Sequence, residues 1–351
     1  MTGRMILQET VQNSLICSVV HNQLPYRSLS VRQFISKRIQ PVDFIYNVAS
    51  PRPFAFSSSS GPILSYFSIS FVFLKTKSMD INIKISNGQV LRGFIRNPGG
   101  RTKAVIIMVH GLGEHIGRYS FLADIFMKNE IGFAGADLPG HGRSDGSRGY
   151  IRDYGLLYEM LDILQADCRK IFPGIPLFLY GHSLGGGIVL SYLLKKNPPV
   201  NGAIVTSPWL KLSDEPSPFK KKLAALAGKI LPSVTIPNGI DPQDISNDSN
   251  VVKEYNDDPL NHDRISLSLA TGAFRAAGGA IREAHLLTKP LLLMHGSDDR
   301  ICSPEGSTEF AAASRKAELK IWKGGFHELH NDLNRSEVID YVISWIMNRI
   351  S

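Results

Sequence analysis

The sequence predicts an α/β protein whose central sheet is mostly parallel and carries helices on both faces. Three observations indicate this class. From Met79 onward, strand-like apolar runs alternate with helical segments. The run over 104–110 is apolar almost throughout, which is typical of a strand buried on both faces. Only one long segment, 211–285, breaks the alternation. Elsewhere, from the run over 104–110 onward, each strand is followed by a helix, which is the pattern of the crossover connections in a parallel sheet.

The first predicted element is a hairpin. Residues 80–86 alternate polar and apolar side chains, Asn87-Gly88 signals a two-residue turn, and 89–96 forms the partner strand. The later strands are short apolar runs, and the helices are longer segments with apolar residues at helical spacing. We expect strands over 104–110, 132–138, 176–180, 202–210, 290–296 and 319–322, and helices over 121–129, 155–172, 184–196, 304–315 and 336–350.

The segment 211–285 contains no run that predicts a strand. It holds two helical patterns, over 219–232 and 269–287, among Pro, Asn and Asp residues. Because it is inserted between two core strands, we expect a helical cap over the carboxyl edge of the sheet, where open α/β sheets place their sites. The predicted core is therefore split into 79–210 and 286–351.

Residues 1–78 are rich in serine, poor in acidic residues and without regular periodicity, so we expect a poorly ordered N-terminal extension. Its apolar run, Ile63–Leu74, is shorter than the ~20 residues that span a bilayer, and the first 30 residues make a poor signal peptide. Three interpretations stay open: a disordered tail, a weak membrane anchor, or sequence upstream of the true start. We favour the last, because Met79 directly precedes the first regular strand.

The net charge of +8 does not indicate a nucleic-acid partner. Residues 1–78 contain eight basic and two acidic residues, whereas the rest of the chain contains 31 basic and 29 acidic residues and is nearly neutral. The three cysteines, Cys17, Cys168 and Cys302, have neither disulfide nor metal spacing, which fits a reducing compartment. We expect a cytoplasmic protein without a cofactor; its oligomeric state is not predicted.

The segment Gly181-His182-Ser183-Leu184-Gly185 matches the nucleophile elbow, G-x-S-x-G, in which a serine occupies a sharp turn from a strand into a helix. A second match surrounds Ser144, but it follows "LPGHG", which is turn chemistry without a strand. Ser183 follows the strand-like "LFLY" and precedes a helical run. We therefore predict Ser183 as the nucleophile and Ser144 as a residue of a surface turn.

A serine nucleophile needs a histidine base and an acid that orients it, and the elbow fixes their chain order as Ser, acid, His. Asp298 and Asp299 follow the strand predicted over 290–296, and His327 lies in the loop before the last helix. These groups therefore emerge at one edge of the sheet. The residues alone leave Asp298 and Asp299 both open as the acid. We expect activity to fall in acid as His327 protonates, at its unperturbed pKa of ~6.5.

The developing oxyanion needs two backbone donors. The N–H of Leu184, directly after the nucleophile, is one candidate. The N–H of Leu112 is the other, because the preceding Gly111 lets the backbone approach closely. A metal site at His110 and His115 is disfavoured, since no further ligand has a useful spacing.

Six motifs resemble, in order, those of the monoacylglycerol lipases and the related lysophospholipases and serine aminopeptidase-like hydrolases: "HGLGEHIGRY", "ADLPGHGRSDGSRGYI", "GHSLGGGIVL", "NDDPLNHDRIS", "HGSDDRIC" and "GGFHELH". The resemblance covers about residues 79–351 and implies the α/β-hydrolase fold. It implies the triad Ser183, Asp299 and His327, which decides between the two aspartates, and an oxyanion hole at Leu112 and Leu184.

The same resemblance places Glu114, Arg118 and His330 near the polar head group of the substrate. For Glu114 and Arg118 the alternative is an ion pair that holds their loop. We expect a serine hydrolase that cleaves lipid carboxylic esters, monoacylglycerols first, through an acyl-enzyme. The alternatives are a lysophospholipase or a general carboxylesterase, then a peptidase or a catalytically silent binding protein.

The helix predicted over 219–232 carries Leu223, Leu226 and Ile230 on one stripe, with four lysines nearby. This pattern suits peripheral contact with a membrane surface. It equally suits a helix packed on its own core with solvated lysines, and we favour the packed arrangement.

Overall fold

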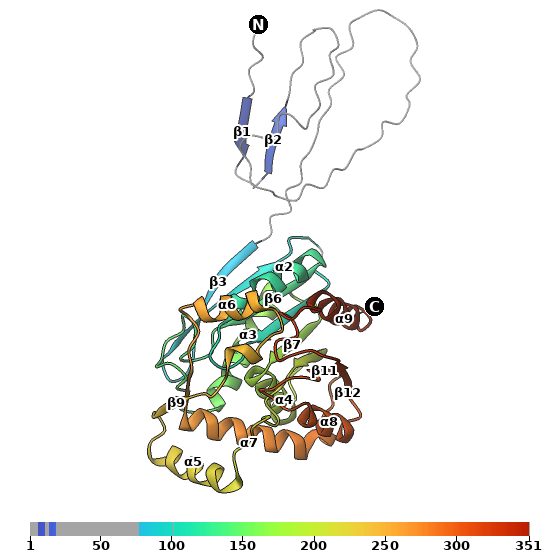
Figure 1. Cartoon of the computed structure of the whole chain (residues 1–351). Coiled ribbons are helices and arrows are strands. Elements are labelled where there is room, and N and C mark those ends of the chain that lie inside the picture. The colour runs from blue at the N-terminus through green and yellow to red at the C-terminus, as the bar shows by residue number, and fades with distance from the viewer. Residues whose placement is uncertain (1–5, 11–13, 19–76, 101, 351) are drawn as a thin grey trace, which may run out of the picture. The chain divides into compact units, whose positions relative to one another are not determined.

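The computed structural model describes residues 6–10, 14–18, 77–100 and 102–350 (Figure 1). The chain divides into two compact units, Met1–Leu74 and Lys75–Ser351. In the first unit, β1 (Ile6–Thr10) pairs antiparallel with β2 (Ser14–Ser18). The rest of the expected poorly ordered extension, 1–78, lies outside the described residues, apart from its last two residues, which begin the first strand of the second unit.

The second unit is built on one eight-stranded sheet. Its strands are β3 (Lys77–Lys84), β4 (Val90–Asn97), β5 (Ala104–Val109), β6 (Ile131–Ala136), β7 (Leu177–His182), β8 (Gly202–Thr206), β11 (Leu291–Gly296) and β12 (Ala317–Trp322). The spatial order is β12-β11-β8-β7-β5-β6-β4-β3. All neighbours from β12 to β6 are parallel, and β4 pairs antiparallel with both β3 and β6. The mostly parallel sheet is confirmed.

The hairpin of β3 and β4 has a longer loop than predicted. The amide of Ile85 donates to the carbonyl of Gln89 at 3.0 Å, so three residues lie between the paired positions. Gly88 has a φ of 89°, the left-handed conformation that a three-residue hairpin loop places at its last position. The two-residue turn inferred from Asn87-Gly88 is therefore wrong by one residue, although it marked the correct place.

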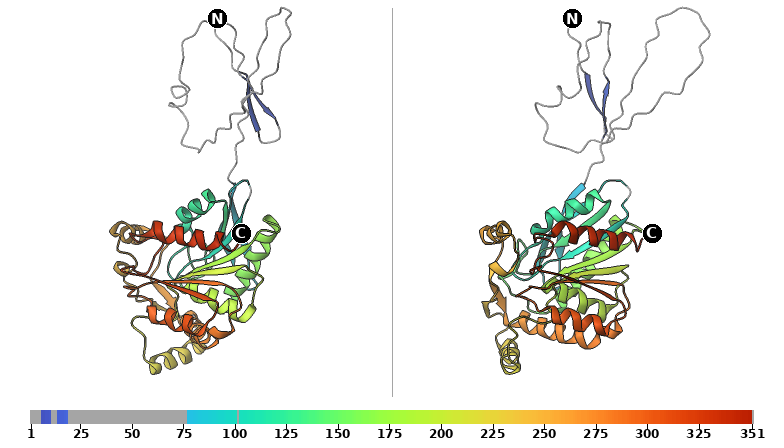
Figure 2. Two further views of the ribbon diagram at one scale, coloured as in Figure 1. Left: turned by 90° about the vertical axis from the view of Figure 1, so that its right-hand side faces the viewer. Right: turned by 45° about the vertical axis from the view of Figure 1, so that its right-hand side comes forward.

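Helices cover both faces of the sheet. On one face lie α2 (Ser120–Lys128) and α9 (Arg335–Met347), and on the other lie α3 (Gly155–Ile171), α4 (Leu184–Lys196) and α8 (Pro304–Ala313) (Figures 1 and 2). Strand β5 shows the arrangement at residue level. Val105 and Ile107 belong to the core under α3 and α4, whereas Ile106 and Met108 belong to the core under α2 and α9. All its side chains are buried, as its apolar sequence predicts.

The segment expected as a cap contains two strands that its sequence did not reveal. Its elements are α5 (Pro218–Ile230), β9 (Thr235–Pro237), α6 (Ser249–Asp257), β10 (Arg264–Ser266) and α7 (Leu267–Glu283). The strands β9 and β10 pair antiparallel, but each has only three residues, too few for an alternating pattern to be recognised. Helix α7 buries a row of alanines and packs on α4 and α8.

Helix α5 differs from the expectation that its apolar stripe packs on the core. No residue of α5 is buried, and Leu223, Leu226 and Ile230 are 57, 58 and 72% exposed. In the part of the chain that the structure describes, no helix is both long and apolar enough to cross a membrane. The exposed stripe of α5 is therefore a surface feature of the folded protein.

Candidate active site

Ser183 occupies a strained turn between β7 and α4, with φ 54° and ψ −119°. The two flanking glycines are required by space. A Cβ on Gly181 would lie 2.5 Å from the carbonyl oxygen of Gly185, and one on Gly185 would lie 2.1 Å from the carbonyl oxygen of Val109. Backbone hydrogen bonds hold the turn, because the Ser183 amide donates to Thr206 O at 3.1 Å and its carbonyl accepts from Trp209 N at 2.9 Å. The predicted strand–turn–helix context is present.

Asp299 and His327 meet beside this turn. His327 Nδ1 lies 2.8 Å from Asp299 Oδ2. The other carboxylate oxygen, Oδ1, accepts hydrogen bonds from the amides of Ile301 and Cys302, both at 2.9 Å. Asp298 is exposed and accepts from the Ser297 hydroxyl. Of the two aspartates that the residues left open, the structure brings Asp299 to the histidine.

Burial and pairing shift both groups in the direction that a catalytic pair needs. Burial alone would raise the pKa of Asp299, but His327 and His295 lower it well below the usual range. Burial alone would lower the pKa of His327, but the Asp299 carboxylate outweighs it and raises the pKa above 6.5. The acid limb of activity expected at the unperturbed value is therefore displaced upward.

The two predicted oxyanion donors flank the nucleophile. Leu184 begins α4, and neither its amide nor that of Leu112 has an acceptor among the described residues. A Cβ on Gly111 would lie 3.2 Å from the Cβ of Ser183, which is the close approach that the glycine was expected to allow. His110 fixes this loop, since Nδ1 donates to Gly111 O at 2.8 Å and Nε2 accepts from Leu138 N at 2.9 Å.

A pocket opens at Ser183. Its lining residues are Gly111, Leu112, Glu114, His182, Ser183, Ile240, Ile245, Tyr255, Ile301, His327 and Glu328. One part of this lining is apolar and the other carries carboxylates and a phenol. A pocket of this kind suits a ligand with one polar and one apolar end.

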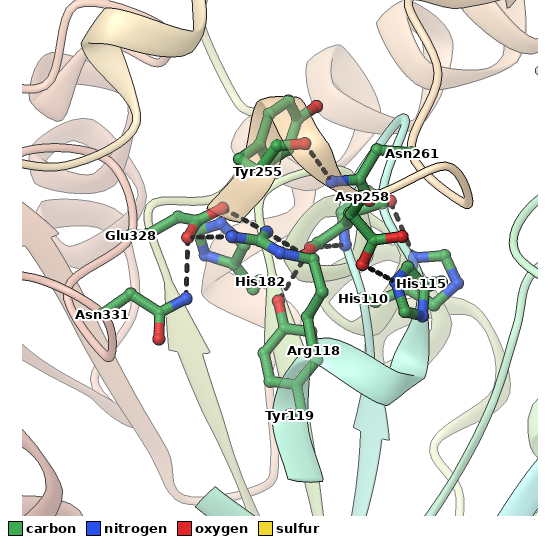
Figure 3. A network of polar contacts seen from close by, with 12 residues as sticks. His110, His115, Arg118, Tyr119, His182, Tyr255, Asp258, Asn261, Glu328 and Asn331 are labelled. Carbon is green, nitrogen blue, oxygen red and sulfur yellow. Dashed lines mark hydrogen bonds and ion pairs between the residues drawn. The ribbon is translucent and has the colours of Figure 1, made fainter. Parts of the chain in front are cut away.

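Glu114 and Arg118 form the ion pair that was the structural alternative to head-group contact, at 2.7 Å. The pair also organises the loop that carries Gly111 and Leu112, because Glu114 Oε1 accepts from the amide of Gly111 at 2.5 Å and from the hydroxyl of Tyr119 at 2.7 Å. Glu328 joins them with two hydrogen bonds from Arg118, at 2.6 and 2.8 Å (Figure 3). Glu328 was not among the site residues predicted from the sequence, although it directly follows His327.

His330 is buried between two rings of this network. Its ring stacks on Tyr119 and meets His182 edge-on, both at a centroid distance of 4.9 Å. Burial lowers its pKa to about 4, so it is neutral at physiological pH. Among the described residues neither ring nitrogen has a hydrogen-bond partner. His330 itself does not line the pocket, and it contacts the lining through the ring of His182.

The loop after α6 ties the cap segment to the loop that follows β5. His115 Nε2 lies 2.8 Å from the Asp258 carboxylate (Figure 3). The amide of His262 donates to the carbonyl of Gly113 at 2.8 Å. The guanidinium of Arg118 lies over the Tyr255 ring at 4.9 Å. These contacts place a phenol from the cap segment in the lining of the pocket.

The second G-x-S-x-G match has a different environment. Ser144 lies in a turn, as expected, but it is buried and not on the surface, with 8% of its area exposed. Its hydroxyl donates to Asp137 O at 2.7 Å and accepts from Arg92 N at 2.9 Å. The first bond ties the turn to the end of β6, and the second ties it to β4.

The described part of the chain has no cluster of three or more His, Cys, Asp or Glu residues that could hold a metal ion. In His110 both ring nitrogens are already engaged. Cys168 and Cys302 are buried free thiols.

The elbow serine, the Asp–His pair and the eight-stranded sheet define a serine hydrolase of the α/β-hydrolase fold. A family model described as "Serine aminopeptidase, S33" matches residues 100–334. Monoglyceride lipase of Mus musculus is 34% identical over 275 residues, which cover 76% of this chain and 89% of the relative. The chain therefore belongs to this serine hydrolase family, with monoglyceride lipases among its relatives, and the resemblance seen in the motifs is confirmed.

Two further relatives match a similar share of this chain. The crystal structure of a Paleococcus ferrophilus monoacylglycerol lipase is 32% identical with a TM-score of 0.68, covering 74% of this chain and 99% of that one. An uncharacterized abhydrolase domain-containing protein of Dictyostelium discoideum is 37% identical over 273 residues. These residues make up 77% of this chain but only 29% of the Dictyostelium protein.

Proposed function

We propose that this protein hydrolyses monoacylglycerols through an acyl-enzyme on Ser183. The observation that carries the proposal is the strained Ser183 turn beside the 2.8 Å Asp299–His327 pair, at one pocket of polar and apolar walls. The substrate class rests on the monoglyceride lipases among the relatives. Serine hydrolysis needs a nucleophile, a base and an orienting acid, and these residues supply all three.

In this mechanism Asp299 keeps the proton of His327 on Nδ1, so that Nε2 is free to accept. His327 takes the proton of Ser183 Oγ while that oxygen attacks the ester carbonyl carbon. The amides of Leu112 and Leu184 stabilise the negative oxygen of the tetrahedral intermediate. His327 then gives the proton to the leaving glycerol oxygen. Water, activated by the same histidine, releases the fatty acid and restores Ser183.

The two walls of the pocket have separate tasks in this proposal. Ile240, Ile245 and Ile301 offer an apolar surface to the acyl chain. Glu114 and Glu328 line the polar side, where the glycerol hydroxyls would lie, and Arg118 and His330 lie behind them without lining the pocket. The carboxylate oxygens accept hydrogen bonds from hydroxyls.

We further propose that α5 contacts the lipid surface from which substrate is drawn. Its exposed apolar residues are continuous with Phe219 and Leu231, which are also exposed. Lys220, Lys222 and Lys229 are exposed on the same helix. Apolar residues flanked by lysines are typical of helices that lie in a membrane interface. Replacing Leu223 and Leu226 by glutamate should weaken sedimentation with anionic vesicles without changing hydrolysis of a soluble ester; unchanged sedimentation would remove α5 from this role.

One substrate panel tests the function. Monoacylglycerols, lysophosphatidylcholines, triacylglycerols and aminoacyl amides of matched acyl length are ranked by kcat/KM, the quantity that reports discrimination. Monoacylglycerols should rank first, and a fluorophosphonate probe should label Ser183. A higher value for lysophosphatidylcholine would indicate a lysophospholipase, and a higher value for the amides a peptidase. Absence of both labelling and turnover would indicate a binding protein.

A further inference from the structure

Carboxylates outnumber lysine and arginine side chains in the lining of the pocket. Among the described residues that line it, two side chains are carboxylates, Glu114 and Glu328, and none is lysine or arginine. The nearest cation in the same network is Arg118, whose side chain is only 10% exposed. A substrate head group in the polar half of the pocket therefore meets carboxylate oxygens directly.

These two carboxylates engage both terminal nitrogens of Arg118. Its Nη1 lies 2.7 Å from Glu114 Oε2 and 2.6 Å from Glu328 Oε1, and its Nη2 donates to Glu328 Oε2 at 2.8 Å. The side-chain amide of Asn331 adds a hydrogen bond to Glu328 at 2.8 Å. Burial opposes ionisation of Glu328, but Arg118 lowers its pKa to about 2. Burial raises the pKa of Glu114, although Arg118 opposes this rise. The ionised Glu328 therefore offsets the charge of the one guanidinium, and the cluster presents no net positive charge to a head group.

Resting on the proposed function, we infer that Glu328 determines head-group specificity: it occupies the only cation of the cluster and makes the pocket reject esters with an anionic head group. A glycerol hydroxyl can donate a hydrogen bond to a carboxylate oxygen, whereas a phosphate dianion presents only acceptors. Two negative groups in a partly desolvated pocket repel each other strongly. Without Glu328, Arg118 would pair with Glu114 alone. The N–H groups that now bind Glu328 would then be available to a phosphate.

A purely structural role for Glu328 predicts a different result. Glu328→Gln keeps the size and one acceptor for Arg118 but removes the charge. If Glu328 only held the loop, the substitution would lower kcat/KM for all esters alike. If it sets specificity, the ratio of kcat/KM for an anionic ester to that for a neutral ester rises.

The experiment compares 1-oleoylglycerol with 1-oleoylglycerol 3-phosphate in mixed micelles of a neutral detergent, using the full-length protein. Glu328→Gln should raise the phosphate-to-neutral ratio about tenfold or more, since a like charge in the pocket is removed. Glu328→Asp, which keeps the charge, should stay nearer the wild-type ratio than Glu328→Gln does. Glu254→Gln, the same charge change at an exposed position of α6, should stay within about twofold of the wild type. An unchanged ratio in Glu328→Gln, or an equal rise in Glu254→Gln, would overturn the inference.

The wild-type protein provides a test that does not depend on any variant folding. An oleoyl ester of 3-amino-1,2-propanediol, which is cationic, should be cleaved at least as well as 1-oleoylglycerol and about tenfold better than the phosphate. Equal cleavage of the cationic and phosphate esters would overturn the inference while leaving monoacylglycerol hydrolysis in place. Absence of Ser183-dependent cleavage of 1-oleoylglycerol would instead overturn the proposed function, and the inference with it.

Discussion

Replacing Asp299 by asparagine tests the triad most directly, because the structure forces one orientation of the new amide. Asp299 Oδ1 accepts from two backbone amides, and Oδ2 faces two imidazoles, His327 Nδ1 at 2.8 Å and His295 Nε2 at 3.1 Å. Asparagine has only one acceptor oxygen. Backbone N–H groups cannot move their protons, so the oxygen must stay with them and the NH₂ group must face His327 Nδ1.

That orientation changes the tautomer of the base. His327 can accept a hydrogen bond at Nδ1 only by carrying its proton on Nε2, and Nε2 then cannot take the proton of Ser183. The carboxylate that stabilises the protonated imidazole is lost as well. We expect kcat to fall about 10⁴-fold, which corresponds to about 5 kcal/mol in the barrier. The free energy of unfolding should change far less, by about 1–3 kcal/mol, the range for one altered buried hydrogen bond.

The assay is kcat on a soluble p-nitrophenyl ester, with the melting temperature measured on the same preparations. Asp298→Asn is the matched control, since Asp298 is exposed and does not reach His327, and its kcat should stay within about twofold of the wild type. A loss below about tenfold in folded Asp299→Asn, or similar losses in both variants, would remove Asp299 from the triad.

Three further predictions follow from the same geometry. Ser183→Ala should abolish labelling by a fluorophosphonate probe, whereas Ser144→Ala should keep labelling but lose about 1–2 kcal/mol in denaturant unfolding, because its buried hydroxyl makes two hydrogen bonds. The acid limb of kcat/KM should lie above pH 6.5, because the pKa of His327 is raised and only its neutral form accepts a proton, and it should move to lower pH in Glu328→Gln. A protein that starts at Met79 should fold and hydrolyse esters, since among the described residues of the eight-stranded sheet it loses two residue pairs, at the start of β3; insolubility of this protein would show that residues before Met79 are needed.

The fold was predictable because each core element has a strong local signal. The predicted bounds of β5 and α4 agree with the structure to within one residue. Both elements are buried nearly all round, so their sequences are continuous apolar runs that are easy to recognise. The short pair β9 and β10 was not predictable. Three residues carry no periodicity, and their pairing depends on a contact between positions far apart in the chain.

The candidate site could be predicted only in part, because some of its residues have a local signal in the sequence and others depend on distant contacts. The elbow glycines have a local steric cause, so Ser183 could be located from the sequence. The choice between Asp298 and Asp299 required the resemblance, because both occupy one loop and only its conformation decides which reaches His327. Glu328 was missed, since its importance comes from Arg118, which is remote in sequence. The exposure of α5 was misjudged because an amphipathic pattern is the same whether a core or a lipid surface faces it.

The carboxylates of this site link specificity to the strength of the base. Glu328 and Glu114 both contribute to raising the pKa of His327, after the larger effects of burial and Asp299. The carboxylates that repel an anionic head group therefore also hold a proton on the histidine more firmly. A firmer hold stabilises the imidazolium that forms when Ser183 attacks, but it reduces the fraction of neutral base as the pH falls. Rejection of anionic esters and sensitivity to acid are thus two consequences of placing two carboxylates on one guanidinium.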